Sequence, residues 1–522
     1  MRLALALFAA VASAQTGSRV CAQCHRAIYE SYMQTPMART SGAVSDDVGA
    51  GAEFTAAGFR YRMRRERGGL SFEFEKPDGA LHGAKTLAYF VGSGATARSY
   101  LLVDDRFYFE APVAFYSGSQ RWGLAPAYDT YAYPYLTRPV TTACLNCHAS
   151  GLRPMAQTLN RFEVPPFSES GIGCERCHGP GDRHVKEMSA ATMVNPGQLN
   201  PAERDSICSE CHLTGAVRVI AAGKRWNSFQ PGARLSDSVK VFVKAGTSPG
   251  MTVTSHVEKL ARSVCKQKSG GRLWCGSCHD PHRVPKASEA AAWFRTKCMV
   301  CHETKGCTET AAARASKQDD CTACHMPKTG VTDAQHVVYT DHSIPRRPRA
   351  AAADTAAVEL VPFDGFTVSD RDTALAYGIA AGRERSGTLR FRALAMLRKA
   401  EREHPNDAEL LMYLAELYRN GEQPDLAISL YQRAMRLDPS QLTASVGLGG
   451  IFMERGQFAE AIPLWEDALT KNSGLELVRT NLAMAYWRMG DLVSAERHLA
   501  KAIALSPAFA PASDLLKRLR QR

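Results

Sequence analysis

Residues 174–184 of the 522-residue chain read Cys174-Glu-Arg-Cys177-His178-Gly-Pro-Gly-Asp-Arg-His184. Two cysteines stand three positions apart, a histidine follows the second at once, and another histidine comes six positions later. The same C-x-x-C-H pattern occurs seven times and accounts for fourteen of the sixteen cysteines. The seven motifs are Cys21-Cys24-His25, Cys144-Cys147-His148, Cys174-Cys177-His178, Cys208-Cys211-His212, Cys275-Cys278-His279, Cys298-Cys301-His302 and Cys321-Cys324-His325.

This spacing is typical of covalent haem attachment. Two thiols three residues apart lie about one helical turn from each other, so both can add to the vinyl groups along one haem edge. The histidine that follows can bind the iron from the proximal side. Zinc sites also use C-x-x-C, but zinc has no reason to require a histidine after every pair. The sequence therefore predicts seven covalently bound haems of the c type.

Six other histidines precede residue 343 and are candidates for the second axial ligand of each iron. They are His82, His184, His256, His282, His336 and His342. A histidine three or six residues past a proximal ligand cannot easily reach over the same ring. We therefore expect His282 and His184 to bind neighbouring haems and so to join the haems into a stack. For any one of the six, the alternative is an ordinary surface or core histidine.

The strings Cys-Glu-Arg-Cys-His-Gly-Pro-Gly, Cys-His-Asp-Pro-His, Cys-His-Met-Pro-Lys328 and Thr340-Asp-His-Ser-Ile-Pro-Arg-Arg347 resemble a known superfamily. It contains the tetrahaem nitrogen-cycle carriers, pentahaem nitrite reductase and hydroxylamine oxidoreductase. The resemblance covers roughly residues 18–347. It implies a largely helical, loop-rich fold, haems packed in parallel and perpendicular pairs, and mostly two histidine ligands per iron. It favours His184, His256, His282 and His342 as distal ligands.

Two departures from that superfamily bear on function. Relatives often place a distal histidine shortly after the first motif, where this chain has Met37. Seven irons need seven distal ligands and only six histidines are available, so Met37 is a candidate ligand, with plain packing as the alternative. The catalytic C-x-x-C-K variant of nitrite reductase is absent from the sequence, which argues against that activity.

The N-terminus predicts export. Met1-Arg2 is followed by an apolar run, residues 3–11, and by Ala12-Ser-Ala-Gln15, which together predict a secretory signal peptide over residues 1–14. The run is too short to cross a bilayer, and no later stretch reaches 18 uninterrupted apolar residues, so no membrane span is expected. The net charge of +12 would ordinarily hint at nucleic acid. Each haem brings two propionates, however, and the basic charge is better understood as balancing them.

A different kind of sequence separates the first two motifs. Residues 54–74 alternate in places around Gly68-Gly69, which predicts a β-hairpin, and further strand-like segments follow at 87–91, 99–103 and 106–110. We expect a small β-rich insertion at about residues 45–135. Its aromatic residues, including Trp122, either shield the first haem or form an independent antiparallel core.

After residue 347 the cysteines stop. Residues 348–370 contain an Ala-rich stretch at 350–357 and are expected to form a linker. From about residue 374 the sequence repeats with a period of 34 residues. Alanine recurs at 393, 427, 461 and 495 and again at 400, 434, 468 and 502. A bulky residue lies between each pair of alanines, at 397, 431, 465 and 499. This resembles the tetratricopeptide repeat and predicts an α-solenoid over residues 371–522. The repeats and the haem domain at residues 15–347 are expected to have separate cores. His404 and His498 belong to the repeats and are not counted as ligands.

The two remaining cysteines, Cys265 and Cys307, could form a disulfide outside the cytoplasm or remain free, and the sequence does not distinguish the two.

The sequence therefore predicts a mainly α protein with a loop-rich multihaem domain, a β-rich insertion and a helical solenoid. The favoured function is an exported, periplasmic electron carrier. Its repeats would dock a redox partner, such as another cytochrome or an envelope electron-transfer complex. The alternative is a multihaem oxidoreductase in which one open iron acts on a small nitrogen or sulfur compound. No catalytic side chain is assigned.

Overall fold

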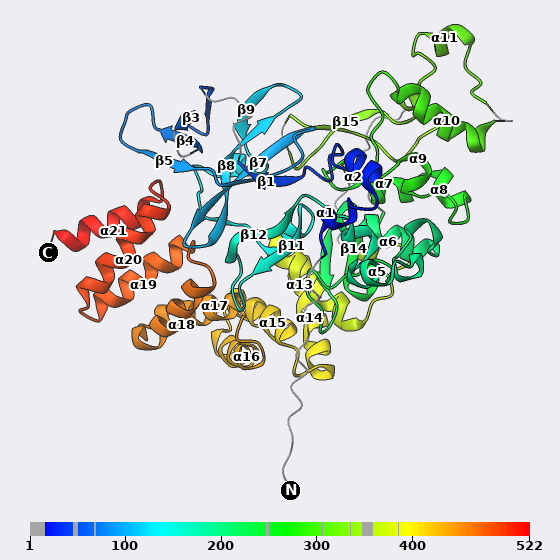
Figure 1. Ribbon diagram of the computed structural model, residues 1–522. Helices are drawn as coiled ribbons and strands as arrows, with labels where there is room; N and C mark the ends of the chain where they lie inside the picture. The colour runs from blue at the N-terminus through cyan, green and yellow to red at the C-terminus, as the bar shows by residue number, and fades with distance from the viewer. Residues whose placement is uncertain are drawn as a thin grey trace.

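The computed structural model describes residues 16–44, 51–66, 69–246, 250–303, 306–334, 336–346, 359–384 and 386–521. The expected signal peptide and the Ala-rich stretch at residues 350–357 lie outside these ranges. Figure 1 shows strands and short helices in the first two thirds of the chain, and an arc of paired helices, from α13 to α21, in the last third.

The segment between the first two motifs forms two antiparallel sheets. A four-stranded sheet has the order β2-β3-β4-β5, and a six-stranded sheet has the order β1-β6-β7-β8-β10, with β9 paired to β8. The strands are β1 Ser41–Ala43, β2 Glu53–Ala56, β3 Phe59–Glu66, β4 Gly69–Glu75, β5 His82–Thr86, β6 Tyr89–Val91, β7 Ala97–Asp104, β8 Phe107–Tyr116, β9 Arg121–Leu124 and β10 Arg138–Pro139. The predicted hairpin is confirmed, since Arg60 pairs with Glu75 and Arg65 with Leu70 along β3 and β4.

One apolar core joins these two sheets. Alternation in β3 and β4 sends Tyr61, Met63, Phe72 and Phe74 to the same buried side, because successive side chains of a strand point to opposite faces. Trp122 belongs to that core and stacks on Tyr100 with ring centres 5.1 Å apart. Of the two interpretations of the insertion, an antiparallel core of its own is therefore the one that the structure supports.

The motif-bearing region consists of short helices joined by loops and small sheets. Its helices are α1 Ser18–Cys21, α2 Arg26–Tyr32, α3 Thr142–Asn146, α4 Glu175–His178, α5 Asp182–Glu187, α6 Pro201–His212, α7 His256–Ala261, α8 Val264–Lys268, α9 Cys275–Cys278, α10 Ala290–His302, α11 Ala311–Ala315 and α12 Cys321–His325. Three small antiparallel sheets accompany them, made of β11 Ala149–Pro154 with β12 Phe162–Ser170, of β13 Val217–Ile220 with β14 Val239–Lys244 and β17 Leu360–Pro362, and of β15 Lys328–Gly330 with β16 Val338–Thr340.

The last third forms four consecutive helix pairs and a closing helix. They are α13 Asp370–Glu384 with α14 Gly387–Glu403, α15 Ala408–Asn420 with α16 Pro424–Leu437, α17 Leu442–Glu454 with α18 Phe458–Lys471, α19 Glu476–Arg488 with α20 Leu492–Leu505, and α21 Ala510–Arg520. The repeated alanines at 393, 427, 461 and 495 lie on the second helix of each pair and are fully buried. Small residues at these points let the paired helices approach closely, while Tyr431 and Trp465 fill the space between them.

The two halves do not have separate cores, and that expectation is wrong. Val217 and Val219 of β13 and Phe242 of β14 belong to the same apolar cluster as side chains of α13 to α17. Strand β17 lies within the expected linker at residues 348–370, pairs antiparallel with β14 and contributes Leu360 to that cluster. Local sequence patterns could not reveal this core, because its two sides are more than a hundred residues apart.

The edge of the solenoid also contacts the β-rich insertion and the loop between β11 and β12. The amide of Leu159 donates to the carbonyl of Lys471 (2.9 Å), and the ammonium of Lys501 pairs with Asp104 (2.9 Å). The hydroxyl of Tyr133 donates to the carboxylate of Glu476 at the start of α19. Figure 1 shows the arc of helices passing beside these strands.

The expected fold class needs a partial correction. The helical solenoid is present, but strands make up 19% of the residues that the structure describes, and several sheets lie in the first two thirds of the chain. A "mainly α" description fits the repeats and not the region before them. Most of the strand residues lie in β1 to β10, in and around the β-rich insertion, and antiparallel pairs such as β11 with β12 add to them.

Among the described helices, none is both long enough and apolar enough to cross a membrane.

Candidate haem-binding site

Each C-x-x-C-H motif lies on a helix or directly at its end. The third, fifth and seventh motifs occupy α4, α9 and α12, and the fourth and sixth close α6 and α10. The amide of His178 donates to the carbonyl of Cys174 at 3.0 Å, and His279 makes the same bond to Cys275 at 2.9 Å. This helical turn brings the two thiols and the following imidazole of a motif to one side of the chain, as haem attachment requires.

Cysteines of different motifs contact one another. The thiol of Cys21 in the first motif lies close enough to Cys174 in the third to raise its own pKa, and Cys147 in the second lies equally close to Cys211 in the fourth, which lowers the pKa of Cys147. Two further contacts join Cys208 to Cys275 and Cys298 to Cys321. These contacts link motif one to three, two to four, four to five, and six to seven.

Two longer-range interactions between thiols connect motifs that these contacts leave unconnected. The pKa of Cys208 is raised by the Cys275 thiol, by burial and also by Cys177 of the third motif. The pKa of Cys278 is raised by burial and by neighbouring thiols, among them Cys301 of the sixth motif. The third motif therefore lies near the fourth and the fifth near the sixth, so every motif has another motif as a neighbour.

The structure brings four of the predicted distal histidines against histidines of the motifs. His25 and His184 are stacked with ring centres 6.3 Å apart and planes inclined by 19°. His178 and His282 lie at 5.8 Å and 10°.

The other two distal candidates form one cluster with two motif histidines. His279 faces His342 at 6.1 Å and 32°, and His212 faces His256 at 5.4 Å and 88°. His256 and His342 themselves lie 5.0 Å apart. The fourth and fifth motifs thus share a compact group of four imidazoles.

These separations fit an iron between two imidazoles. Metal–imidazole bonds are roughly 2 Å long, so imidazoles on opposite sides of one ion have ring centres about 6 Å apart. The pairs His25–His184, His178–His282 and His279–His342 lie at that distance. In each pair the distal member belongs to a loop or helix that follows a different motif, as expected for His184 and His282.

Hydrogen bonds orient several of these imidazoles. The Nδ1 atoms of His178 and His184 donate to the carbonyls of Val194 and Ser189, each at 2.9 Å. His325 and His342 make equivalent bonds to Pro345 (3.1 Å) and Thr340 (2.9 Å). A donating Nδ1 leaves the lone pair on Nε2, and metal-binding histidines are commonly held in this way.

Burial keeps the clustered imidazoles neutral. Desolvation, followed by the neighbouring imidazoles, lowers the pKa of His256 to about 3 and that of His279 to about 4. Burial also lowers the pKa of His148, His212 and His342. A neutral imidazole has the free lone pair that a metal ligand needs.

His148 of the second motif has a partner that the sequence analysis missed. Its Nδ1 lies 2.8 Å from the hydroxyl of Thr40, in the turn after α2. Met37 precedes Thr40 by three residues, is half-buried, and accepts the amide of Ile172 at its carbonyl (3.0 Å). Since Thr40 carries no recognisable motif, only the tertiary contact identifies it.

Two other candidates lie apart from the histidine pairs. His82 is exposed at the first residue of β5, in the sheet that Figure 1 draws beside the last helices of the solenoid. His336 is exposed and packs edge-on against Tyr116, with ring centres 5.4 Å apart. In the described part of the chain, no ring contact joins either of them to a motif histidine.

Both cysteines outside the motifs are free in the structure. Cys265 is half-buried, and its thiol acts on the pKa of Cys278 and Cys298 in the fifth and sixth motifs. Cys307 is exposed. Of the two alternatives for this pair, the structure has free thiols.

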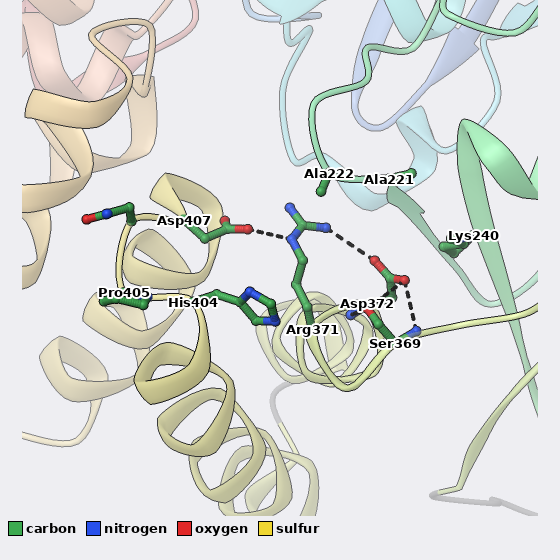
Figure 2. A pocket seen from close by; sticks show the side chains of 10 residues that line it. Ala221, Ala222, Lys240, Ser369, Arg371, Asp372, His404, Pro405 and Asp407 are labelled. Atoms are coloured by element: carbon green, nitrogen blue, oxygen red, sulfur yellow. Dashed lines mark hydrogen bonds and ion pairs between the residues drawn. The ribbon is translucent and has the colours of Figure 1, made fainter.

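A cavity of about 540 Å³ marks the joint between the motif region and the repeats. Figure 2 shows Arg371 of α13 with its guanidinium directed at Asp407 and Asp372. The same guanidinium donates to the carbonyl of Ile220 on β13 (3.1 Å). His404 lines this cavity and lies on the repeat side, as expected for a residue that is not an iron ligand.

Comparisons with known proteins match both halves of the chain. The family "Cytochrome c554 and c-prime" matches residues 133–179, which include the second and third motifs. Tetratricopeptide repeat families match residues 392–441, 417–476 and 452–519.

A curated relative is "Multiheme cytochrome MtrA" of Shewanella baltica (strain OS185), 25% identical over 157 residues. The match covers 27% of this chain and 45% of that protein, so the chain spans less than half the length of this relative. Among solved structures, "Crystal structure of MamA" is 22% identical over 28% of this chain and 82% of the other (TM-score 0.26). "MamA 41-end from Desulfovibrio magneticus RS-1" is 23% identical over 28% and 84% (TM-score 0.26).

The motif geometry and these matches agree with each other. The chain is a multihaem c-type cytochrome fused to tetratricopeptide repeats.

Proposed function

We propose that the chain is an exported electron carrier with seven haems, one for each motif, and that its repeats dock a redox partner. When bound, haem c supplies an iron that takes up and releases single electrons. The protein's part is to hold these groups close together and to fix their axial ligands. The observation that carries the proposal is the continuous series of contacts between motifs.

That series gives the order of the relay. The first motif touches the third, the third lies near the fourth, and the fourth leads through the fifth to the sixth and seventh. The second motif lies beside the fourth, through Cys147 and Cys211, and forms a branch. Because neighbouring motifs lie close together, an electron would cross only a short distance between each haem and the next in this series.

The histidine pairs support axial ligation by two imidazoles at four of the irons. We assign His25 with His184, His178 with His282, His212 with His256, and His279 with His342. His82, His336 and Met37 stay candidates for the other three irons. Met37 is the candidate for the iron bound by His148, because Thr40, three residues on, holds that histidine. Ligation by methionine would raise the potential of that haem above its neighbours.

We propose the following division of the chain. Residues 1–14 form the signal peptide, 15–347 the heptahaem domain, 348–370 the linker and 371–522 the repeat domain. The partner would be another cytochrome or an electron-transfer complex of the cell envelope. Because one edge of the solenoid already contacts the chain's own β-rich insertion, the partner would bind another face of the repeats.

Carbon monoxide separates the carrier from the oxidoreductase. Spectra of the reduced full-length protein, taken with and without carbon monoxide, should be the same if every iron has two protein ligands. A carbon monoxide complex would reveal an open iron and would favour an enzyme acting on a small nitrogen or sulfur compound. Met37→Ala sharpens the test, since it should remove the near-infrared band of a His/Met haem and create one high-spin iron. Met33→Ala, at another half-buried methionine just after α2, is the matched control and should leave that band unchanged.

A further inference from the structure

A second cavity, of about 320 Å³, lies where the solenoid meets the β-rich insertion. One wall is the turn between β7 and β8 together with Arg161, and the other consists of α18, α19 and α20 with the loop that joins the first two. The residues used below are Asp104, Asp105, Arg161, Glu466, Ser473, Arg479 and Lys501. None of them belongs to the haem-binding site.

Arg479 of α19 is the unusual member of this lining. Its side chain is only 8% exposed, and one guanidinium nitrogen, Nη2, donates to the carbonyl of Ser473 at 2.9 Å. Its buried Nε has no hydrogen-bond partner among the described residues, and no ion pair to Arg479 is present there. Burial lowers the pKa of this guanidinium, and the attraction of Glu466 and Asp104 offsets only part of that shift. A buried guanidinium that lacks both an ion pair and a partner for Nε is costly, so an anion that accepts from Nε here would be stabilising.

Ser473 supplies a second group of the same kind. It is 7% exposed, and its hydroxyl is buried without a partner in the described structure. A hydroxyl can donate to an anion, and its backbone carbonyl already fixes the position of Arg479. The cavity therefore has two buried, adjacent donors on the repeat side.

The acidic residues of the cavity already have partners. Asp104 pairs with Lys501 (2.9 Å) and Asp105 with Arg161 (3.1 Å). Glu466 pairs with His498 (3.1 Å) and accepts the hydroxyl of Tyr486 (2.9 Å). Asp104 and Asp105 are each held in an ion pair, whereas burial keeps His498 beside Glu466 neutral, so among the described lining residues Arg479 is the cation without an ion pair of its own.

We propose that this cavity binds a small oxyanion, either a phosphate or a carboxylate, on the guanidinium of Arg479 and the hydroxyl of Ser473. Guanidinium groups match the oxygen spacing of both anions and bind them through two parallel hydrogen bonds. Lys501 and Arg161 stand at the sides of the cavity and add positive potential. The bound anion would join the repeats to the insertion, and the site is separate from the electron relay.

Titration calorimetry on the full-length, haem-loaded protein tests this, with inorganic phosphate and acetate as probes in buffers of matched chloride content. We expect saturable binding of at least one probe. Arg479→Gln should weaken it about tenfold or more, because hydrogen bonds to a charged group are lost. Arg488→Gln, at an exposed arginine of the same helix, is the matched control and should bind as the unaltered protein does.

Ser473→Ala keeps the test valid if Arg479→Gln does not fold, and it should weaken binding several-fold. Tighter binding of phosphate would define a phosphate site, and tighter binding of acetate a carboxylate site. Heats that never saturate with either probe would overturn the proposal. Equal binding by the unaltered protein, Arg479→Gln and Ser473→Ala would overturn it as well.

Discussion

The repeats and the segment that carries the last three motifs are built on different principles. In α15, six of thirteen residues are buried, and apolar packing fixes the position of the helix. In α8, α9, α10, α11 and α12, all of whose residues the structure describes, none is buried. A region with so few buried side chains cannot stabilise itself by the hydrophobic effect. Covalently attached cofactors, around which such helices can pack, are the natural source of its stability.

The repeats are not independent of the haem domain, because they share a core with β13 and β14, which precede the segment of the last three motifs. The cluster containing Phe242, Val217 and Val219 continues into α13 and its neighbours. The solenoid is therefore a structural support for the motif region as well as a candidate docking surface. We first predict the effects of removing this support, and then the effects of changes at single sites.

The largest effect should come from removing the repeats. A chain ending at residue 346 would expose Phe242, Val217 and Val219, and fully burying three such side chains contributes roughly 5–9 kcal/mol. That is comparable with the whole stability of a typical domain. We expect little soluble, haem-loaded protein, measured by haem staining and absorbance after expression. A truncated protein with normal yield and an unchanged melting temperature would restore the earlier expectation of separate cores.

A single substitution in the shared core should have the next largest effect. Phe242 is fully buried, and Phe242→Ala should lower the free energy of unfolding by about 3–5 kcal/mol. Phe391 on α14 is 77% exposed, so the matched change Phe391→Ala should stay within about 0.5 kcal/mol. Thermal unfolding measures both. Equal, small shifts of the melting temperature in the two variants would mean that the core shared by the repeats and by β13 and β14 contributes little to stability.

Removal of one distal histidine should change one iron and leave the fold intact. His184→Ala deletes the imidazole that faces His25 and should convert one low-spin haem to high spin. The exposed His404 of the repeats provides the control, and His404→Ala should leave the spectrum unchanged. Electron paramagnetic resonance of the oxidised protein measures the spin state of the haem irons directly. If His184→Ala yields no new high-spin signal, the pairing with His25 is wrong.

The smallest effect concerns the pH dependence of stability at the contact between the solenoid and the β-rich insertion, where Tyr133 donates to Glu476. Burial raises the pKa of Glu476, although hydrogen bonds from Tyr133 and Thr137 oppose the shift. A carboxyl group whose pKa is higher in the folded than in the unfolded state loses stability as the pH rises between those two values. Glu476→Gln, which cannot ionise, should therefore flatten the fall in melting temperature from acid to neutral pH. Glu460→Gln, at an exposed position of α18, should keep the original pH dependence; identical profiles for all three proteins would remove Glu476 as the cause.

Local patterns predicted those parts of the fold that depend on neighbours in sequence. The alternation around residues 59–75 gave the hairpin, and the period of 34 residues gave helices whose alanines, such as Ala427 and Ala461, are buried at each crossing. The pairing of β17 with β14 was not predictable, because a strand of three residues within the expected linker carries no signal of its partner. The contact between the solenoid and the insertion was missed for the same reason.

The candidate site divides in the same way. The spacing within each motif is a local property, and the structure has every motif at a helical turn. Which distal histidine faces which motif depends on tertiary contacts, and the sequence analysis named the candidates without pairing them. Thr40 beside His148 carried no local signal at all. Residues that orient a ligand through one hydrogen bond are recognised only in the folded chain.

The central claim is that the chain carries one haem on each of its seven motifs. The most direct measurement is the intact mass of the protein, matured in a host that attaches haem c and denatured in acid, so that only covalently bound groups remain. The account predicts a mass equal to the processed chain plus seven haems, in a single dominant species. A dominant species with six or fewer haems would contradict it, and peptide mapping would then identify the motif that is not used.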